Sequence, residues 1–479
     1  GIQTTFDYDA LGRVAWIKPP SGHDGWTQYS YLDATSTQPA RVRIWQRDGH
    51  TTSAPIVEQS ELHFDAFGRL WREKRLLPSG LWATRETGYN AIGWRTYQTE
   101  WETATSPVER TSFLQYDPFG RPGIIRPPEG SVHDVAFTYV GVRRVERTAK
   151  IALSRDAAGA IVESPIKTTE VYDTLGRLWR VWEDDGVTGW KTEYAYDPHD
   201  RLKRVTQVRP EGTQQRTFNY DGRGVLFSEC HPEKGSFGNG CVSYHQADAL
   251  GRPTRVIDGP QDVTLTYDRA QRLAQVRETT GAARVLSEYV YVNGTSFDWS
   301  RGKLRTATQH NYFPEFGGLD FPVAETYTYS GTGGRVSRLE TRINANDVYL
   351  QDYTWNRQGR SSQHRYPSCT HCGTADGPTR WQSYGYTQGQ LTSVPGWASS
   401  ITYHPNGLYH QISHANGTVT TQANGPDGTA RPGEISVWKG ATPLYLSGQY
   451  QYDGSGNVAK IGQDYYLYDR LGRLVEGTM

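Results

Sequence analysis

Four cysteines have the widest choice of chemistry in this chain. They form two local pairs, Cys230 with Cys241 and Cys369 with Cys372. An even number of cysteines in an exported protein points to disulfides, and each pair would close a short loop. Alternatively, all four thiolates would meet on one zinc ion, which prefers tetrahedral sulfur ligands from Cys-x-x-Cys segments. A redox role for the second pair would need a helix after Cys369, and the sequence from Gly373 onward lacks a helical pattern.

Histidines and acidic residues are the other side chains that could hold a metal. His404, His410 and His414 cluster in sequence, and the last two share strand parity, which would turn them to the same side. Asp184-Asp185 and Asp453 stand beside glycines in turn contexts, but no 12-residue loop with alternating oxygen ligands surrounds them. The Walker Gly-x-x-x-x-Gly-Lys, Gly-x-Ser-x-Gly and His-Glu-x-x-His motifs are absent. We therefore predict no catalytic residue, no cofactor and no dedicated metal site.

The composition indicates which elements must carry these residues. The 479 residues include 31 Tyr, 15 Trp, 51 Gly and 25 Pro. Aromatic residues, Thr and Val favour strands, and glycine recurs too often for long helices, so the predicted class is all-β. Acidic and basic residues are both 51, and this zero net charge gives no general attraction for nucleic acid or an anionic membrane. No apolar run approaches the roughly 18 residues of a membrane-spanning helix.

One motif, aromatic-Asp-x-x-Gly-Arg, recurs from one end of the chain to the other. The residues of its five strict copies are Tyr8, Asp9, Gly12 and Arg13; Phe64, Asp65, Gly68 and Arg69; Tyr116, Asp117, Gly120 and Arg121; Tyr172, Asp173, Gly176 and Arg177; and Tyr468, Asp469, Gly472 and Arg473. Eight relaxed copies begin at Tyr89, Tyr196, Tyr220, Ala247, Tyr267, Trp355, Tyr403 and Tyr452, and eroded copies are expected near Tyr31 and Tyr139. The period of roughly 20 to 28 residues is typical of a repeat architecture.

Each position of the motif has a physical explanation as a turn between two strands. The aromatic residue ends a strand, and the aspartate carboxylate accepts hydrogen bonds from backbone N–H groups two residues on. The glycine supplies the left-handed step of a type I turn with a bulge. The arginine then begins the return strand. The sequence therefore predicts a series of β-hairpins.

Hairpins of this kind are not stable alone, so we expect them to stack into one continuous sheet. Asp, Gly and Arg would then form ladders along the stack. Each arginine would lie near its own aspartate and over neighbouring aromatic rings. The planar, stacking guanidinium explains why 41 arginines stand against ten lysines.

The repeated Tyr-Asp-x-x-Gly-Arg-Leu pattern resembles the YD repeat of RHS proteins, a family that includes bacterial Rhs polymorphic toxins, B and C components of Tc toxins, and teneurins. The resemblance covers essentially all of residues 1–479. It implies a long sheet that spirals into a hollow shell, or part of one. In toxin relatives the shell encloses a C-terminal toxic polypeptide, an aspartyl autoprotease segment releases that cargo, and a propeller or plug often closes one end.

The chain departs from the full family pattern. It ends at Met479, just after a strict copy, and no Asp-Pro-x-Gly core motif stands near that end. The letters of that motif occur at Asp117-Pro118-Phe119-Gly120, but inside a repeat, where we expect only a turn. We therefore predict a single repeat array over residues 1–479 without a propeller, autoprotease or toxin domain. Because it begins at Gly1, we treat the chain as a fragment or a processed form.

These observations favour a structural function over an enzymatic one. The prediction is a shell segment of a secreted or cell-surface RHS protein from a toxin-type system, whose partner is an enclosed cargo polypeptide or another shell component. The main alternative is an extracellular module that binds carbohydrate or a cell surface through exposed aromatic residues. A glycan-acting enzyme is less favoured because no isolated carboxylate pair stands out from the repeat. Neither nucleic acid nor a membrane span is predicted.

Overall fold

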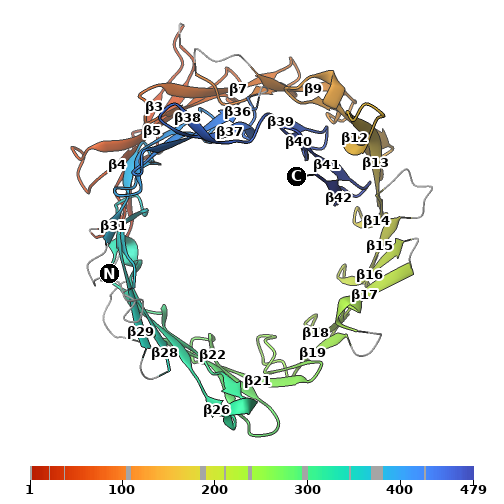
Figure 1. The fold of residues 1–479 in the computed structure, drawn as a ribbon, viewed down its shortest axis with the longest axis vertical. Coiled ribbons are helices and arrows are strands. Elements are labelled where there is room, and N and C mark those ends of the chain that lie inside the picture. The colour runs from red at the N-terminus through yellow and green to blue at the C-terminus, as the bar shows by residue number, and fades with distance from the viewer. Residues whose placement is uncertain are drawn as a thin grey trace. The chain divides into compact units, whose positions relative to one another are not determined.

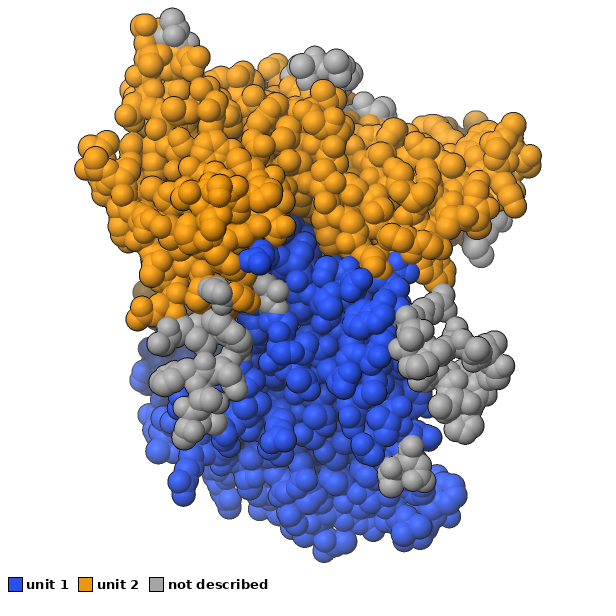
Figure 2. Space-filling view, turned by 90° about the vertical axis from the view of Figure 1, so that its left-hand side faces the viewer, with its two compact units in different colours: residues 1–2, 189–382 blue, residues 3–188, 383–479 orange. Residues whose placement is uncertain are grey.

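The computed structural model describes residues 3–20, 22–36, 38–103, 109–183, 190–209, 212–235, 240–293, 300–344, 347–367, 381–425 and 428–478. The contacts between residues divide the chain into two compact units (Figure 2). Unit 1 comprises residues 1–2 and 189–382, and unit 2 comprises residues 3–188 and 383–479. This division does not test whether residues 1–479 are one continuous repeat array, which stays a prediction.

The described residues form strands, turns and four one-turn 3-10 helices, with no α-helix among them. The main sheet has 29 strands. Its described pairings are antiparallel and, with one exception in unit 1, join strands that follow each other along the chain, as in β1–β2 (Thr5–Tyr8 and Val14–Lys18). Both the all-β class and the sheet built from successive hairpins are thereby confirmed.

Unit 2 begins with strands β1 to β14 of this sheet. After β1 and β2, these are β3 (Thr27–Leu32), β4 (Arg41–Arg47), β5 (Ile56–Phe64), β6 (Leu70–Leu76), β7 (Trp82–Tyr89), β8 (Arg95–Thr99), β9 (Arg110–Tyr116), β10 (Pro122–Arg126), η1 (Ser131–His133), β11 (Val135–Val140), β12 (Arg144–Arg155), β13 (Ile161–Tyr172) and β14 (Leu178–Trp182). The pairing of β12 with β13 is the longest register of the sheet, from Arg144 opposite Val171 to Arg155 opposite Ile161.

The C-terminal part of unit 2 forms three smaller sheets. They contain β32 (Gly385–Thr387) and β33 (Gln390–Ser393); β34 (Ala398–Tyr403), β35 (Tyr409–His414), β36 (Thr418–Asn424), β37 (Pro432–Lys439) and β38 (Thr442–Leu446); and β39 (Tyr450–Tyr452), β40 (Val458–Ile461), β41 (Asp464–Tyr468) and β42 (Leu474–Gly477). These strands lie against one face of the sheet formed by β3 to β13 (Figure 1), and β41 contacts β12. Unit 2 is therefore a two-layer structure.

Unit 1 consists of further hairpins with one small additional sheet. Its elements are β15 (Lys191–Tyr196), β16 (Leu202–Arg209), β17 (Gly212–Tyr220), β18 (Leu226–Cys230), η2 (Pro232–Lys234), β19 (Cys241–His245), β20 (Arg255–Asp258), β21 (Gln261–Tyr267), β22 (Leu273–Glu278), β23 (Val285–Tyr291), β24 (Leu304–Gln309), β25 (Tyr312–Phe313), η3 (Pro314–Phe316), β26 (Leu319–Asp320), β27 (Val323–Tyr329), η4 (Thr332–Gly334), β28 (Val336–Ile343), β29 (Asp347–Trp355), β30 (Ser361–Arg365) and β31 (Trp381–Ser383). Strands β25 and β26 pair only with each other, so β24 pairs with β27 in the main sheet.

The buried apolar residues lie mostly in unit 2, where a second layer of strands covers the first sheet. Among the described residues they are Ala54, Leu77, Ala83, Ala149, Ile151, Ala152, Val242, Ala398, Ile401, Ala459 and Leu467, and only Val242 belongs to unit 1. Side chains on a covered face of a sheet are fully buried, whereas in a single layer the side chains on both faces stay partly exposed to solvent. On β12, Ala149, Ile151 and Ala152 are at most 1% exposed. The core of unit 2 thus lies between its two layers.

The motif glycine is required for its backbone conformation. Gly176 has φ +79°, and a Cβ built on it would meet no atom within 4 Å. A side chain there would be strained only by the left-handed backbone, which costs about 1–2 kcal/mol for an L-residue. We predict that Gly176→Ala lowers the free energy of unfolding by that amount, measured as a decrease in the urea midpoint.

The matched control is Gly222→Ala in the turn after Tyr220. Gly222 also has open space around its Cβ position, but its φ is not positive. Alanine should be neutral there, or stabilise by about 0.5 kcal/mol through the unfolded chain. Equal effects of the two substitutions would contradict this explanation of the motif glycine.

Candidate functional site

The repeated turn is the most frequent polar arrangement in the structure. At Asp173, the carboxylate accepts hydrogen bonds from Leu175 N (2.9 Å), Arg177 N (3.0 Å) and Arg177 Nε (2.7 Å). The backbone of the same turn is closed by Gly176 N donating to Asp173 O at 3.1 Å. The same three carboxylate bonds occur at Asp9, Asp65, Asp117, Asp197, Asp248 and Asp469. Each aspartate thus caps the turn and orients its arginine.

The oriented arginine links its turn to the next hairpin. The guanidinium carbon of Arg121 lies 4.1 Å from the ring centre of Tyr139, and the Tyr139 hydroxyl donates to Pro122 O at 3.2 Å. Both contacts recur between Arg13, Val14 and Tyr31; Arg69, Leu70 and Tyr89; Arg201, Leu202 and Tyr220; Arg252, Pro253 and Tyr267; and Arg272, Leu273 and Tyr291. A cation–π contact and a hydrogen bond therefore tie each of these turns to its neighbour.

The repeat motif predicts an arginine over a neighbouring ring, but it does not predict the hydrogen bond from the tyrosine hydroxyl. The sequence does contain an indication of this hydrogen bond, because the first position of the motif is tyrosine more often than phenylalanine. Where a tryptophan occupies that position, the indole serves in the same way: Trp355 Nε1 donates to Val336 O at 2.7 Å. A ring with a donor at its far end is thus what the position requires.

The hydrogen bonds of the turn also control the ionisation of its aspartates. At Asp197 the hydrogen bond from the Arg201 side chain, together with backbone donors, lowers the pKa to about 2. The pKa of Asp248 and of Asp268 is lowered mainly by the side-chain hydrogen bonds from Arg252 and Arg272. These carboxylates stay charged far into the acidic range and are therefore poorly suited to act as general acids.

A relaxed copy of the motif, beginning at Tyr452, fastens the second layer of unit 2 to the first. Asp453 is 1% exposed, and its carboxylate accepts a hydrogen bond from Ala152 N of β12 at 3.1 Å. It also accepts bonds from Ser455 N, Asn457 N and Asn457 Nδ2 within its own turn. In the other copies of the motif the carboxylate caps its own turn. In this copy it also binds the backbone of a strand about 300 residues away in sequence.

The departures of this turn from the strict motif fit its docking position. Asn457 replaces the arginine and donates to Asp453 Oδ2 at 3.0 Å. Gly454 follows the aspartate, and a Cβ there would lie 3.1 Å from Lys150 Cβ. Ser455 Oγ donates to Lys150 O at 2.9 Å. These small residues allow the turn to approach β12 closely. Asparagine in place of the motif arginine was the feature of the sequence that could have indicated this contact.

Other polar contacts join the same two layers. The Arg75 guanidinium donates to Pro405 O, Gln388 Oε1 accepts from Gln59 N at 3.1 Å, and Arg431 forms an ion pair with Glu129. Burial lowers the pKa of Arg75 and of Arg431 from their ordinary values. The guanidinium carbon of Arg155 lies 3.8 Å from the ring centre of Tyr465.

The remaining candidates from the sequence are distributed over the two units. Cys230 and Cys241 are opposite each other on β18 and β19 and form a disulfide, so neither sulfur is a thiolate zinc ligand. Cys369, Cys372 and the Asp184-Asp185 pair lie outside the described residues.

The three clustered histidines are engaged by neighbouring polar groups. His404 Nε2 contacts Gln422 O at 2.7 Å, His410 Nδ1 contacts Thr402 Oγ1 at 3.3 Å, and His414 Nε2 contacts Thr420 Oγ1 at 2.9 Å. Burial lowers the pKa of His404. Within the ranges that the structure describes, no three His, Cys, Asp or Glu side chains gather as metal ligands would.

Strand pairing in chain order, combined with the repeated aromatic-Asp turn, defines an all-β sheet built from repeated hairpins. Known family models and curated protein sequences contain no match to this chain. Solved structures do. A Photorhabdus luminescens Tc holotoxin pore aligns with a TM-score of 0.66 at 16% identity, covering 92% of this chain and 24% of that one.

Of the described residues, none belongs to a helix long and apolar enough to cross a membrane.

Two crystal structures of the TcdB2-TccC3 protein give the same result as the holotoxin pore. The first has a TM-score of 0.64 at 15% identity and covers 99% of this chain and 28% of that chain. The second lacks the hypervariable C-terminal region and has a TM-score of 0.65 at 16% identity, covering 92% and 24%. The chain thus spans about a quarter of the length of the chains it matches. The resemblance to RHS proteins is confirmed at the level of the fold.

The lowered aspartate pKa predicts acid sensitivity with a definite sign. A folded pKa of about 2 for Asp197, against about 3.9 in an unfolded chain, gives stability that is complete above about pH 4 and lost as the pH falls toward 2. We expect the urea midpoint to fall over this window, and Asp197→Asn to reduce the fall. Asp347→Asn is the control, because Asp347 is exposed and no hydrogen bond to its carboxylate is found in the described residues. An unchanged pH profile in Asp197→Asn would contradict the assignment.

The Asp453 contact predicts a local loss of protection. Asp453→Ala removes a buried acceptor and leaves the Ala152 amide without it, at a cost of about 3 kcal/mol. We expect faster amide hydrogen exchange in β12 and in β39 to β42, measured by mass spectrometry. Asp173→Ala serves as the control, because the Asp173 carboxylate bonds only to its own turn among the described residues. Exchange in β12 that responds equally to both substitutions would refute an interlayer role.

Proposed function

We propose that this chain is a length of shell wall in an RHS-type protein and that its function is containment of a polypeptide. The observation that carries the proposal is the fold: a 29-stranded sheet paired in chain order, similar to the Tc holotoxin pore chain over 92% of this sequence. The partners we propose are an enclosed cargo chain and further parts of the same shell. We propose that residues 1–479 act as one repeat array in this wall.

The physical chemistry of the sheet suits this function. Successive strands satisfy each other's backbone N–H and C=O groups, so the wall has few open edges through which another chain could pair. Turn-to-turn contacts such as Arg121 with Tyr139 fasten each hairpin to the next. We propose a structural role rather than an enzymatic one, because the acidic groups of the repeat serve as turn caps.

We also propose that the protein acts outside the cytosol as part of a toxin-type system. The Cys230–Cys241 disulfide supports this location, because disulfides persist in oxidising compartments. The likeness to a Tc holotoxin pore and to TcdB2-TccC3 supports the toxin context.

Imaging of the isolated chain by cryo-electron microscopy tests containment. We expect a curved wall with a solvent-filled concave side large enough for an unfolded polypeptide. As a matched sample, Asp453→Ala should keep the wall and lose density where residues 447–478 pack against it. A filled, globular particle without a concave face would refute the containment proposal.

A further inference from the structure

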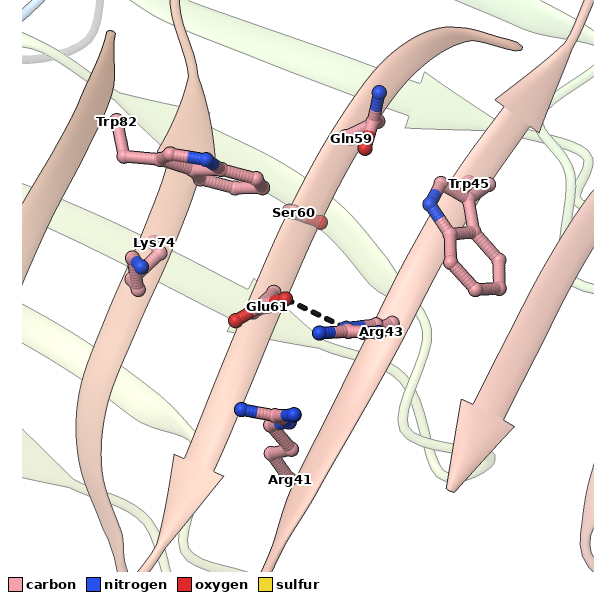
Figure 3. Close-up of a pocket in the computed structure, with 8 residues that line it drawn as sticks. All are labelled: Arg41, Arg43, Trp45, Gln59, Ser60, Glu61, Lys74 and Trp82. Carbon is pink, nitrogen blue, oxygen red and sulfur yellow. Dashed lines mark hydrogen bonds and ion pairs between the residues drawn. The ribbon is translucent and has the colours of Figure 1, made fainter. Parts of the chain in front are cut away.

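A pocket of about 340 Å³ opens on strands β4 to β7, away from the repeat turns (Figure 3). Its lining includes Arg41, Arg43, Glu61, Lys74 and two tryptophans, Trp45 and Trp82. Arg43, Glu61 and Lys74 are direct neighbours across three strands, so their side chains stand in one row on one face of the sheet. Figure 3 shows Trp82 near the Lys74 end of this row and Trp45 near the Arg43 end, both on the same side of the row, with Arg41 on the other side.

The pocket is on the face of the sheet opposite the C-terminal layer. Successive side chains of a strand point to opposite faces. On β6, Arg75 donates to Pro405 of the C-terminal layer, whereas its neighbour Lys74 lines the pocket. The second layer of unit 2 therefore does not cover the pocket.

The charges of the pocket favour an anion. Three cationic side chains accompany a single carboxylate, that of Glu61, giving a local charge of +2. Burial alone would raise the pKa of Glu61, but hydrogen bonds from Arg43 Nε (2.7 Å) and His63 Nε2 (3.0 Å) hold the pKa below its ordinary value. Glu61 is thus ionised and already occupied, and it fixes the orientation of Arg43.

Arg41 and Arg43 have N–H groups that are available to a bound ligand. Throughout the described ranges, no acceptor is found for the Arg41 guanidinium, whose Nε is buried, or for the terminal nitrogens of Arg43. A buried guanidinium nitrogen without an acceptor is costly, and a bound carboxylate would relieve that cost through bidentate hydrogen bonds. Lys74 Nζ lies 4.9 Å from the Trp82 ring centre, which holds the ammonium at the edge of the pocket.

The tryptophans add a requirement for a flat, partly apolar ligand. An indole offers a large rigid surface on which the C–H face of a pyranose ring can rest. The volume suits one or two sugar rings, since small-molecule sites begin at about 300 Å³. The amide of Gln59, next to Trp45 across the strands, can bond to ring hydroxyls.

From these features we infer that the pocket on β4 to β7 binds a saccharide unit that bears a carboxylate, such as a sialic or uronic acid. Arg41 and Arg43 hold the carboxylate, and Trp45 or Trp82 supports the sugar ring. A single-stranded nucleic acid fits less well, because it needs a basic groove that continues along the strand, and this pocket is local and contains Glu61. This binding site goes beyond the containment proposed above and does not depend on it.

Ligand-observed NMR with N-acetylneuraminic acid and galacturonic acid tests the inference. We expect at least one of them to bind at least about tenfold more tightly than its neutral methyl ester, because hydrogen bonds to a charged group are worth at least one factor of ten. Acetate, which has the charge without the ring, should bind more weakly by a similar factor. The proposal is overturned if acid and ester bind equally, or if neither acid binds at concentrations up to about 10 mM. Tighter binding of a single-stranded oligonucleotide would overturn it as well.

Variants separate the pocket from the rest of the surface. Arg41→Gln and Trp82→Ala should each weaken binding by about tenfold. Arg95→Gln and Trp397→Ala, which change exposed residues elsewhere, should leave it unchanged. If Trp82→Ala fails to fold, as judged by circular dichroism, Lys74→Gln provides the second test. Full binding in Arg41→Gln and in Lys74→Gln would place the ligand outside this pocket.

Discussion

An arginine held over the ring of a tyrosine in the next hairpin is the contact on which this structure depends. The turn aspartate orients the guanidinium, as Asp117 does for Arg121, and the ring of Tyr139 receives it. The hydroxyl of the same ring then binds the carbonyl that follows the arginine. Since a lone hairpin is barely stable in water, this repeated link is what makes each hairpin a template for the next. Strand order that follows chain order is the direct result.

The two units use this link with different amounts of burial. In unit 1 the described side chains are mostly half-buried, because a single layer of hairpins leaves both faces partly open. In unit 2 the C-terminal strands cover one face, and Ala149 and Ile151 become fully buried. Asp453 shows how a repeat turn can change its role: with glycine and asparagine in place of larger residues, its carboxylate reaches the backbone of β12.

Strand alternation then gives the sheet of unit 2 two chemically distinct faces. On β6, Arg75 belongs to the face that the C-terminal layer covers, and Lys74 belongs to the face that carries the pocket. A wall and a binding surface are therefore compatible in one sheet, because neighbouring residues serve opposite sides. The zero net charge of the chain hides this local difference, since the pocket has a surplus of cations.

The sequence by itself determined the local structure: aromatic residue, aspartate, glycine and arginine specify a turn through short-range hydrogen bonds and backbone conformation. It also indicated the all-β class, because repeated hairpins must stack to bury their apolar surface. Only the tertiary structure decided that strands β32 to β42 lie on the first sheet and that Asp453 meets Ala152. It also decided that Trp45 and Trp82 lie near the two ends of the row formed by Arg43, Glu61 and Lys74. Such contacts join residues that are far apart in sequence. They depend on the register of the strands and on the face to which each side chain points. Both follow from the stacking of whole strands, and a local sequence pattern does not encode that stacking.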